Sequence, residues 1–146
     1  MRASAISIIG FLLIALGSCG PATVAINPAI QGDPPGMTVR ADWNDVDAAA
    51  DIAGPQVELA MLSKSLETLP GGMGEHRYMF LATDDTEFDL RVRQAQPGAG
   101  VEAPGPLKLT AEGHPRRDPK REATLISAMA RRLEDLAGKE WAPVRE

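Results

Sequence analysis

Few side chains in this sequence stand where they could perform acid, base or nucleophilic chemistry together. The two histidines, His76 and His114, lie far apart, and neither belongs to a His-Glu-x-x-His or paired-cysteine pattern that binds zinc. No Gly-x-Ser-x-Gly elbow marks a serine nucleophile, and Ser63, Ser65 and Ser127 fall within strand or helix patterns. These residues therefore predict no catalytic, cofactor or metal site.

Two groups of carboxylates are the remaining candidates for such chemistry. The first lacks the glycine and the terminal glutamate of a calcium loop, so it predicts a helix cap and a solvated helix face, formed by Asp42, Asn44, Asp45, Asp47 and Asp51. The second, Asp84 and Asp85, lies in a Thr-Asp-Asp-Thr sequence typical of a turn. A hydrolase site that combines Asp84, Asp85 and Asp89 is the alternative hypothesis, which a deep pocket would favour.

A cluster of cations precedes and begins the last predicted helix. Positive charge at the start of a helix opposes the helix dipole, and this applies to His114, Arg116, Arg117, Lys120 and Arg121. A bound anion would relieve the conflict and use the free amides of the first turn. The cluster is therefore a candidate site for a lipid head group, an anionic envelope polymer or an acidic partner protein. The alternative is a solvated loop whose charge is eased by Asp118 and Glu122.

The N-terminus carries an export pattern. After Met1-Arg2 an apolar run covers residues 5–16, about 12 residues where a membrane-spanning helix needs about 20. The run leads to Leu16-Gly17-Ser18-Cys19, and Cys19 is the only cysteine in the chain. An exported lone thiol cannot form an internal disulfide, but its thiolate is a nucleophile that can be alkylated.

The sequence Leu16-Gly17-Ser18-Cys19 resembles the lipobox of bacterial lipoprotein precursors, over about the first twenty residues. The resemblance implies removal of residues 1–18, a diacylglyceryl group on the thiol of Cys19 and acylation of the new amine. Two or three acyl chains hold a protein stably in a membrane where one would be marginal. Gly20 in place of the aspartate that signals inner-membrane retention favours the outer membrane. Ordinary secretion is the alternative, but a cut after Gly20 would place Pro21 next to the cleaved bond.

Composition and charge restrict the rest of the chain. Of the 146 residues, 44% are hydrophobic and 24% are charged, which is typical of one globular domain. The net charge of −5 becomes −6 when residues 1–18 are removed, because Arg2 is their only charged residue. This charge argues against nucleic-acid binding, and the 4% of aromatic residues argues against aromatic-lined recognition.

Periodicity predicts the first elements of a domain at residues 37–146. Residues 19–36, with four prolines after the lipidated cysteine, read as an extended tether. A short strand is expected at 37–40, then a helix capped by Asp42 and ended by Gly54-Pro55. The run 56–65 fits either a strand or a helix, and the alternation of Val57, Leu59 and Met61 favours a strand.

The second half of the chain is easier to interpret. Strands at 77–82 and 87–93 flank the Thr-Asp-Asp-Thr turn, a mobile loop is expected at 96–106, and a strand follows from Leu107. The last helix starts at Asp118-Pro119 and stops at Gly138, with Trp141 expected to cap the edge of the core. Its apolar stripe is Leu125, Ile126, Met129, Leu133 and Leu136.

The predicted fold class is α+β, with a mainly antiparallel sheet of four or five strands and two helices on one face. The domain resembles small bacterial lipoproteins of no known function, through Asp42-Trp43, residues 45–49 and residues 128–133. We therefore expect a membrane-tethered envelope lipoprotein that binds or scaffolds another component. A small membrane-anchored hydrolase is the alternative.

Overall fold

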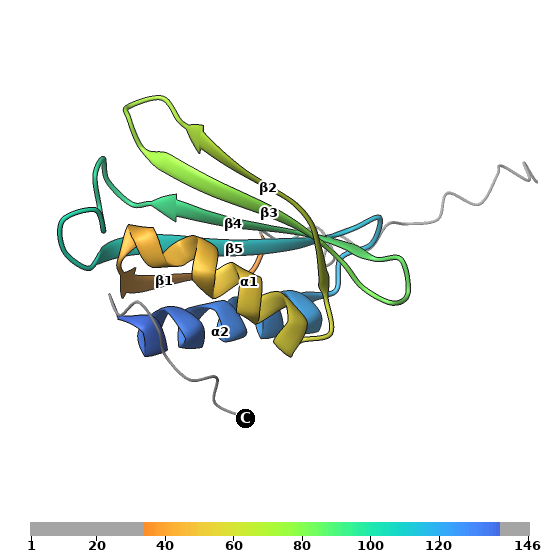
Figure 1. The fold of residues 1–146 in the computed structure, drawn as a ribbon. Coiled ribbons are helices and arrows are strands. Elements are labelled where there is room, and N and C mark those ends of the chain that lie inside the picture. The colour runs from red at the N-terminus through yellow and green to blue at the C-terminus, as the bar shows by residue number, and fades with distance from the viewer. Residues whose placement is uncertain (1–33, 138–146) are drawn as a thin grey trace, which may run out of the picture.

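The computed structural model describes residues 34–137, and its elements follow the predicted α+β class. The elements in chain order are β1 Gly36–Ala41, the 3-10 turn η2 Trp43–Asp45, α1 Val46–Gln56, β2 Ala60–Thr68, β3 Gly74–Leu81, β4 Glu87–Gln94, β5 Gly105–His114 and α2 Pro119–Leu136. The five strands form one sheet of order β1-β5-β4-β3-β2, in which every neighbouring pair is antiparallel. Both helices pack on the same face of this sheet (Figure 1).

The β3–β4 hairpin confirms the predicted pair of strands, and both strands are longer than predicted at the end away from the turn, where β3 begins at Gly74 and β4 ends at Gln94. Its turn closes where Ala82 N donates to the carbonyl oxygen of Thr86 at 2.9 Å, and Asp84 Oδ1 accepts from Thr86 N at 3.2 Å. The alternation in β4 places Phe88, Leu90 and Val92 in the core, and all three are fully buried. The opposite face of the strand is the polar one, as expected.

Helix α1 differs from the prediction at both ends. Asp42 caps the 3-10 turn, where its Oδ1 accepts from Asn44 N at 2.9 Å, and the α-helix begins at Val46. Gly54-Pro55 was wrongly predicted to end the helix, which continues to Gln56. Gly54 lies against Phe80, and a Cβ at position 54 would come within 2.3 Å of Phe80 Cε1. The glycine therefore allows the helix to approach the sheet closely.

The ambiguous run at 56–65 contains the end of one element and the start of another. Gln56 closes α1, residues 57–59 connect, and β2 begins at Ala60. The strand prediction is therefore correct only from Ala60 onward. Leu59 is buried in the connection, which explains why the apolar alternation starts before the strand does.

Helix α2 begins and packs as predicted. The Asp118 side chain accepts from Arg121 N at 3.1 Å, and Pro119 occupies the first turn. The five predicted stripe residues are all buried in the core. The helix ends with Ala137 in the left-handed conformation at φ 42°, and the predicted roles of Gly138 and Trp141 lie outside the described residues.

The two ends of the sheet differ in what they hold. The amino end is where β1 begins, and it also holds the β3–β4 turn, the end of α1 and the start of α2 (Figure 1). The loop end is opposite and holds residues 69–73 and 95–104. Figure 1 shows β2 and β3 reaching the loop end as a projecting hairpin.

The loop at residues 95–104 is held in place by hydrogen bonds, although a mobile segment was expected there. Gln94 Nε2 donates to Ala99 O at 2.8 Å, and Trp43 N donates to Gly100 O at 2.8 Å. Arg40 Nη2 donates to Pro104 O at 3.0 Å. Gln94 is buried, so the loop is fixed from inside the sheet, and β5 starts at Gly105, within the range predicted to be loop.

Candidate functional site

The predicted cationic cluster lies at the amino end. Within the described part of the chain, two of its members have an ion-pair partner and three do not. Arg117 pairs with Glu122 through Nε–Oε1 and Nη2–Oε2 contacts of 2.7 Å each. Arg121 Nη1 donates to Asp84 Oδ2 at 2.8 Å, with its guanidinium 5.2 Å from the centre of the Phe88 ring. The other three members of the cluster, His114, Arg116 and Lys120, are exposed and have no ion-pair partner among residues 34–137.

The amides at the start of α2 are largely satisfied within the chain. Glu122 is fully buried, and its Oε1 accepts from Gly113 N at 2.9 Å and from Asp118 N at 3.1 Å. Burial alone would raise the pKa of Glu122, but hydrogen bonds from Arg117 and from Gly113 N outweigh burial, so the pKa is lowered. This geometry is that of the alternative interpretation, in which Asp118 and Glu122 ease the positive charge.

The three carboxylates of the hydrolase hypothesis do not converge: Asp84 and Asp85 share an exposed turn, and Asp89 lies apart from them. Asp84 lies in an exposed turn and pairs with Arg121 of α2, on the helical face of the sheet. Asp89 points to the open face, where it is buried between Arg77 Nη2 at 2.7 Å and Arg91 Nη2 at 2.6 Å. Burial alone would raise the pKa of Asp89, but the hydrogen bonds from the two arginines outweigh it, so the pKa is lowered.

A polar cluster that the sequence did not indicate lies between α1 and β3. Tyr78 donates its hydroxyl to Asp47 Oδ1 at 2.6 Å, and His76 Nδ1 is 3.5 Å from the same oxygen. Burial lowers the pKa of His76, and burial together with the hydrogen bond to Asp47 raises the pKa of Tyr78. The Trp43 and His76 rings lie 4.5 Å apart between centroids. Tyr78 is fully buried, so this cluster fixes α1 on the sheet rather than presenting a reactive group.

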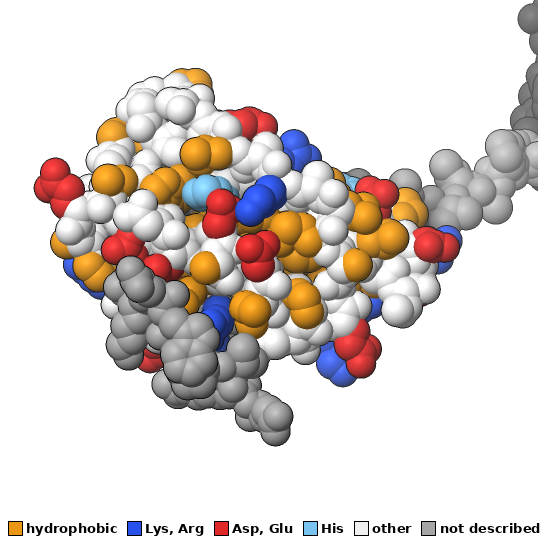
Figure 2. Space-filling model, viewed as in Figure 1, with side chains coloured by type: hydrophobic (Ala, Val, Ile, Leu, Met, Phe, Trp, Pro, Cys, Tyr) orange, Lys and Arg blue, Asp and Glu red, His pale blue; other side chains and the backbone are white. Residues whose placement is uncertain are grey.

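Metal binding finds no support in the described part of the chain. Residues 34–137 contain no group of three or more histidine, cysteine, aspartate or glutamate side chains placed to hold an ion. The acidic run at residues 42–51 is instead divided among the cap of Asp42, the Tyr78 contact of Asp47 and the exposed helix face. Figure 2, which views the helical side, shows acidic and basic side chains interspersed with apolar ones and no continuous field of one sign.

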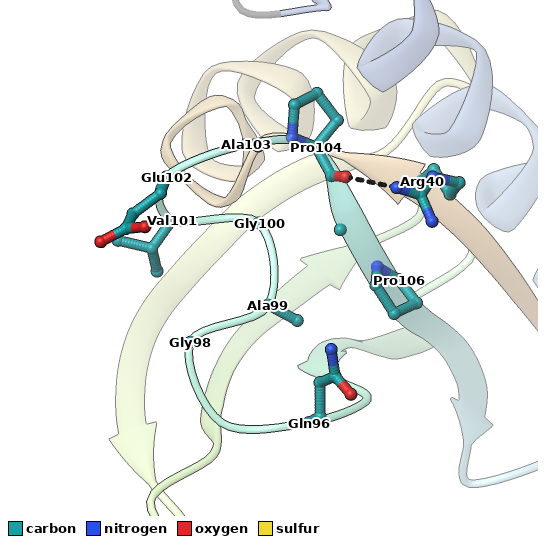
Figure 3. A pocket seen from close by; sticks show the side chains of 11 residues that line it. Arg40, Gln96, Gly98, Ala99, Gly100, Val101, Glu102, Ala103, Pro104 and Pro106 are labelled. Carbon is teal, nitrogen blue, oxygen red and sulfur yellow. Dashed lines mark hydrogen bonds between the residues drawn. The ribbon is translucent and has the colours of Figure 1, made fainter.

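A hollow of about 530 Å³ opens at the loop end, between Arg40 and the loop at residues 95–104. Figure 3 shows Gln96 at the bottom and the guanidinium of Arg40, bonded to Pro104 O, at the upper right, with Pro106 between them. Glu102 and Val101 extend away from the ring that the loop forms (Figure 3). The one cationic side chain that lines this hollow is therefore Arg40.

Two more hollows follow the edge strand β1. One, of about 510 Å³, lies on the open face of the sheet and is lined by Gly36, Thr38, Lys108 and Thr110, among others. The other, of about 490 Å³, lies between β1 and α2, with Met37, Val39, Ala130 and Leu133 as its apolar lining. Arg40 lines both this second hollow and the one at the loop end. We refer to β1 with these three hollows as the β1 edge site.

The β1 edge site was not predicted from the sequence. Its parts come from β1, the start of β5 and the middle of α2, which only the fold brings together. The nearest signal was the Pro/Gly-rich stretch before Leu107, which we interpreted as a mobile loop. Sequence periodicity identified β1 as a strand but does not show which strand lies at an edge.

Comparisons with known proteins identify no relative: no family model, no curated protein and no solved structure matches this chain. No helix among residues 34–137 is long and apolar enough to cross a membrane. The function must therefore be argued from the residues and the geometry alone.

Proposed function

We propose that this protein is a lipid-tethered binding module of the bacterial envelope, anchored through Cys19 on the exported side of a membrane. The observation that carries the proposal is the apolar run at residues 5–16 followed by Leu16-Gly17-Ser18-Cys19. In a bacterium with an outer membrane, Gly20 favours the periplasmic face of that membrane. The partner is then an envelope protein or an anionic envelope polymer.

The position of β1 supports the tether. The chain between Cys19 and Gly36 can span no more than about 60 Å even when fully extended. The domain would therefore stay within that distance of the lipid surface, joined to it through the amino end. The exposed cations Arg116 and Lys120 lie at the same end and would face the lipid head groups.

Binding is favoured over catalysis by what the described domain exposes. The candidate carboxylates of a hydrolase lie on opposite faces of the sheet, and Asp89 is covered by two arginines. Three hollows follow a strand edge and a fixed loop, which is an arrangement that suits recognition of another chain, and a smaller one of about 330 Å³ is lined by Lys120 and Arg121.

Acylation of Cys19 is the direct test. Wild-type chain expressed in a diderm bacterium should incorporate labelled palmitate, and mass spectrometry should show an N-terminus at Cys19 with added acyl mass. Cys19→Ser should abolish both signals because a hydroxyl does not replace the thiolate in the alkylation. Ser18→Ala keeps a small residue beside the cleaved bond, so this control variant should be processed as the wild type is.

A wild-type chain that keeps residues 1–18, or that is cut elsewhere with an unmodified thiol, would contradict the anchor. Release of the wild type into the soluble fraction on osmotic shock would do the same.

A further inference from the structure

We propose that the β1 edge site binds an extended peptide as a sixth strand of the sheet, with a carboxylate of that peptide held by Arg40. This inference names the partner class of the binding module and so rests on the proposed function. Four features of the described residues support it: an open strand edge, an apolar hollow, a hollow of mixed lining and an unpaired cation.

The first feature is the open edge of β1. Among residues 34–137, Gly36–Ala41 pairs with β5 alone, and in this part of the chain its other side presents a row of backbone donors and acceptors. Such an edge is a template for another extended chain. The six-residue register with β5 is regular from Gly36↔Thr110 to Ala41↔Gly105, so the edge is straight enough to accept a strand.

The other open edge, β2, is less suited to strand addition. Its register with β3 shifts between Met61 and Ser63, which marks a bulge. It also carries Lys64, whose Nζ lies 3.6 Å from Asp47 Oδ2. Bulges and lysines are common devices that prevent pairing at sheet edges, and β1 has neither.

The second and third features are the hollows on the two sides of β1. Toward the helices, Met37 is 41% exposed and lies with Val39 and Leu133 around a space that an apolar side chain could fill. Toward the open face, Thr38 and Lys108 contribute polar groups to a space of mixed lining, which Pro34 and Met37 also border. Successive side chains of a strand point to opposite faces, so a bound peptide would place apolar and polar residues alternately in these two spaces.

The fourth feature is Arg40. Its guanidinium donates one hydrogen bond, to Pro104 O, and has no carboxylate partner among residues 34–137. Lys108, also without an ion-pair partner there, pairs with Thr38 and so lies diagonally from Arg40 on the same face. Guanidinium groups bind carboxylates through charge-assisted hydrogen bonds, so a peptide carboxylate complements this end of the edge. A terminal carboxylate at Arg40 requires a peptide that runs parallel to β1.

The experiment uses the full acylated chain in detergent and a synthetic array of octapeptides. In one half of the array each peptide ends in a free carboxylate, and the last residue is each of the apolar amino acids in turn. The other half contains the same peptides as C-terminal amides. We expect micromolar binding of a subset with the free carboxylate and at least tenfold weaker binding of the matching amides. Two results together would show that Arg40 binds an acidic side chain of the peptide and not its C-terminal carboxylate. The peptides with a free carboxylate would bind as well as their amides, and changing an internal glutamate of the peptide to glutamine would weaken binding tenfold.

Variants locate the site. Arg40→Gln should weaken binding at least tenfold, whereas Arg116→Gln removes an exposed cation at the amino end and should leave binding unchanged. N-methylation of the peptide amides should abolish binding at alternate positions only, because a strand donates every second amide to its neighbour. Cys19→Ser should bind the array as the wild type does, so loss of acylation and loss of peptide binding are separate results.

Three results would overturn the inference. The first is an array with no ligand for the wild type, and the second is an Arg40→Gln variant that binds as the wild type does. The third is binding that appears only after removal of residues 138–146, which would show that the chain's own C-terminal segment occupies the edge.

Discussion

Glu122 and Asp89 show how single residues decide the energetics of this small domain. Each is a carboxylate with almost no exposed surface, and each is bound by guanidinium groups that remain partly exposed to water. Removing one member of a buried pair leaves the other without compensation, which costs more than the pair itself contributes. The stability of the amino end therefore depends on Glu122 more than on any exposed cation of the cluster.

Glu122→Gln should lower the free energy of unfolding at pH 7 by about 2–4 kcal/mol, because Arg117 loses its counter-ion and two amides lose a charged acceptor. The difference should depend on pH. Because the folded pKa of Glu122 is lowered from 4.5, its contribution is complete above pH 4.5 and is lost as the pH falls through the folded value. Urea unfolding at a series of pH values measures both effects.

Glu134→Gln is the matched control for this prediction, since Glu134 lies on the exposed side of the same helix. It should change stability by less than about 0.5 kcal/mol at every pH. A gap between Glu122→Gln and the wild type that persisted unchanged at pH 3 would contradict the assignment of the effect to the ionised carboxylate.

Contacts between residues that are close in sequence were predicted correctly. Asp118 was correctly predicted to cap α2, and Asp84 forms the predicted turn contact. The pairing of Arg121 with Asp84 and of Tyr78 with Asp47 was not predicted, because these partners are far apart in sequence. Charge at the start of α2 therefore looked less compensated in the sequence than it is in the fold.

At the scale of elements, strong periodicity was a reliable guide and breaker residues were not. The β3–β4 hairpin and α2 have long amphipathic patterns, and both were predicted close to their observed bounds. Gly54-Pro55 was expected to end the helix, and α1 includes both residues and ends one residue later, at Gln56. Gly105-Pro106 was expected in a loop but begins β5.

Gly54→Ala should destabilise the domain although alanine is the better helix former. A Cβ within 2.3 Å of Phe80 Cε1 forces α1 and β3 apart, at a cost of about 1–3 kcal/mol that exceeds the gain in helix propensity. Chemical denaturation of Gly54→Ala, Phe80→Leu and the double variant forms a cycle. We expect the double variant to lose less free energy of unfolding than the two single variants lose together. Strictly additive losses would show that the two residues do not compete for this space.

At the scale of the whole molecule, the sequence was enough to predict a sheet with helices on one face, but not which strand lies at an exposed edge. One-sided alternation in β4 and one apolar stripe in α2 were enough to predict a sheet covered on one face. The order of the strands, which makes β1 an edge, depends on pairing between distant segments and had no local signature. The β1 edge site could not be predicted for that reason.

The placement of exposed cations predicts how the domain meets a lipid surface. A soluble chain beginning at Gly20 should bind vesicles containing 30% phosphatidylglycerol, and changing Arg116 and Lys120 together to serine should weaken binding on the order of tenfold. The control pair Lys108→Ser and Arg131→Ser removes the same charge from exposed positions away from the amino end. Vesicle co-sedimentation at 0.1 M salt compares the two, and equal losses would show that only net charge matters.

The pairing of β1 with β5 also constrains when the domain can fold. Ala41 pairs with Gly105 and Gly36 with Thr110, so among the described residues the first strand has no neighbour until about three quarters of them, up to Thr110, are present. A polypeptide that crosses a membrane with its amino end leading would therefore emerge with β1 unable to close the sheet. Strands β2 to β5 follow one another as a meander and can form first from local contacts. In a chain exported in that direction, β1 could pair with β5 only after β5 had also crossed, so β1 would join the sheet after the meander has formed.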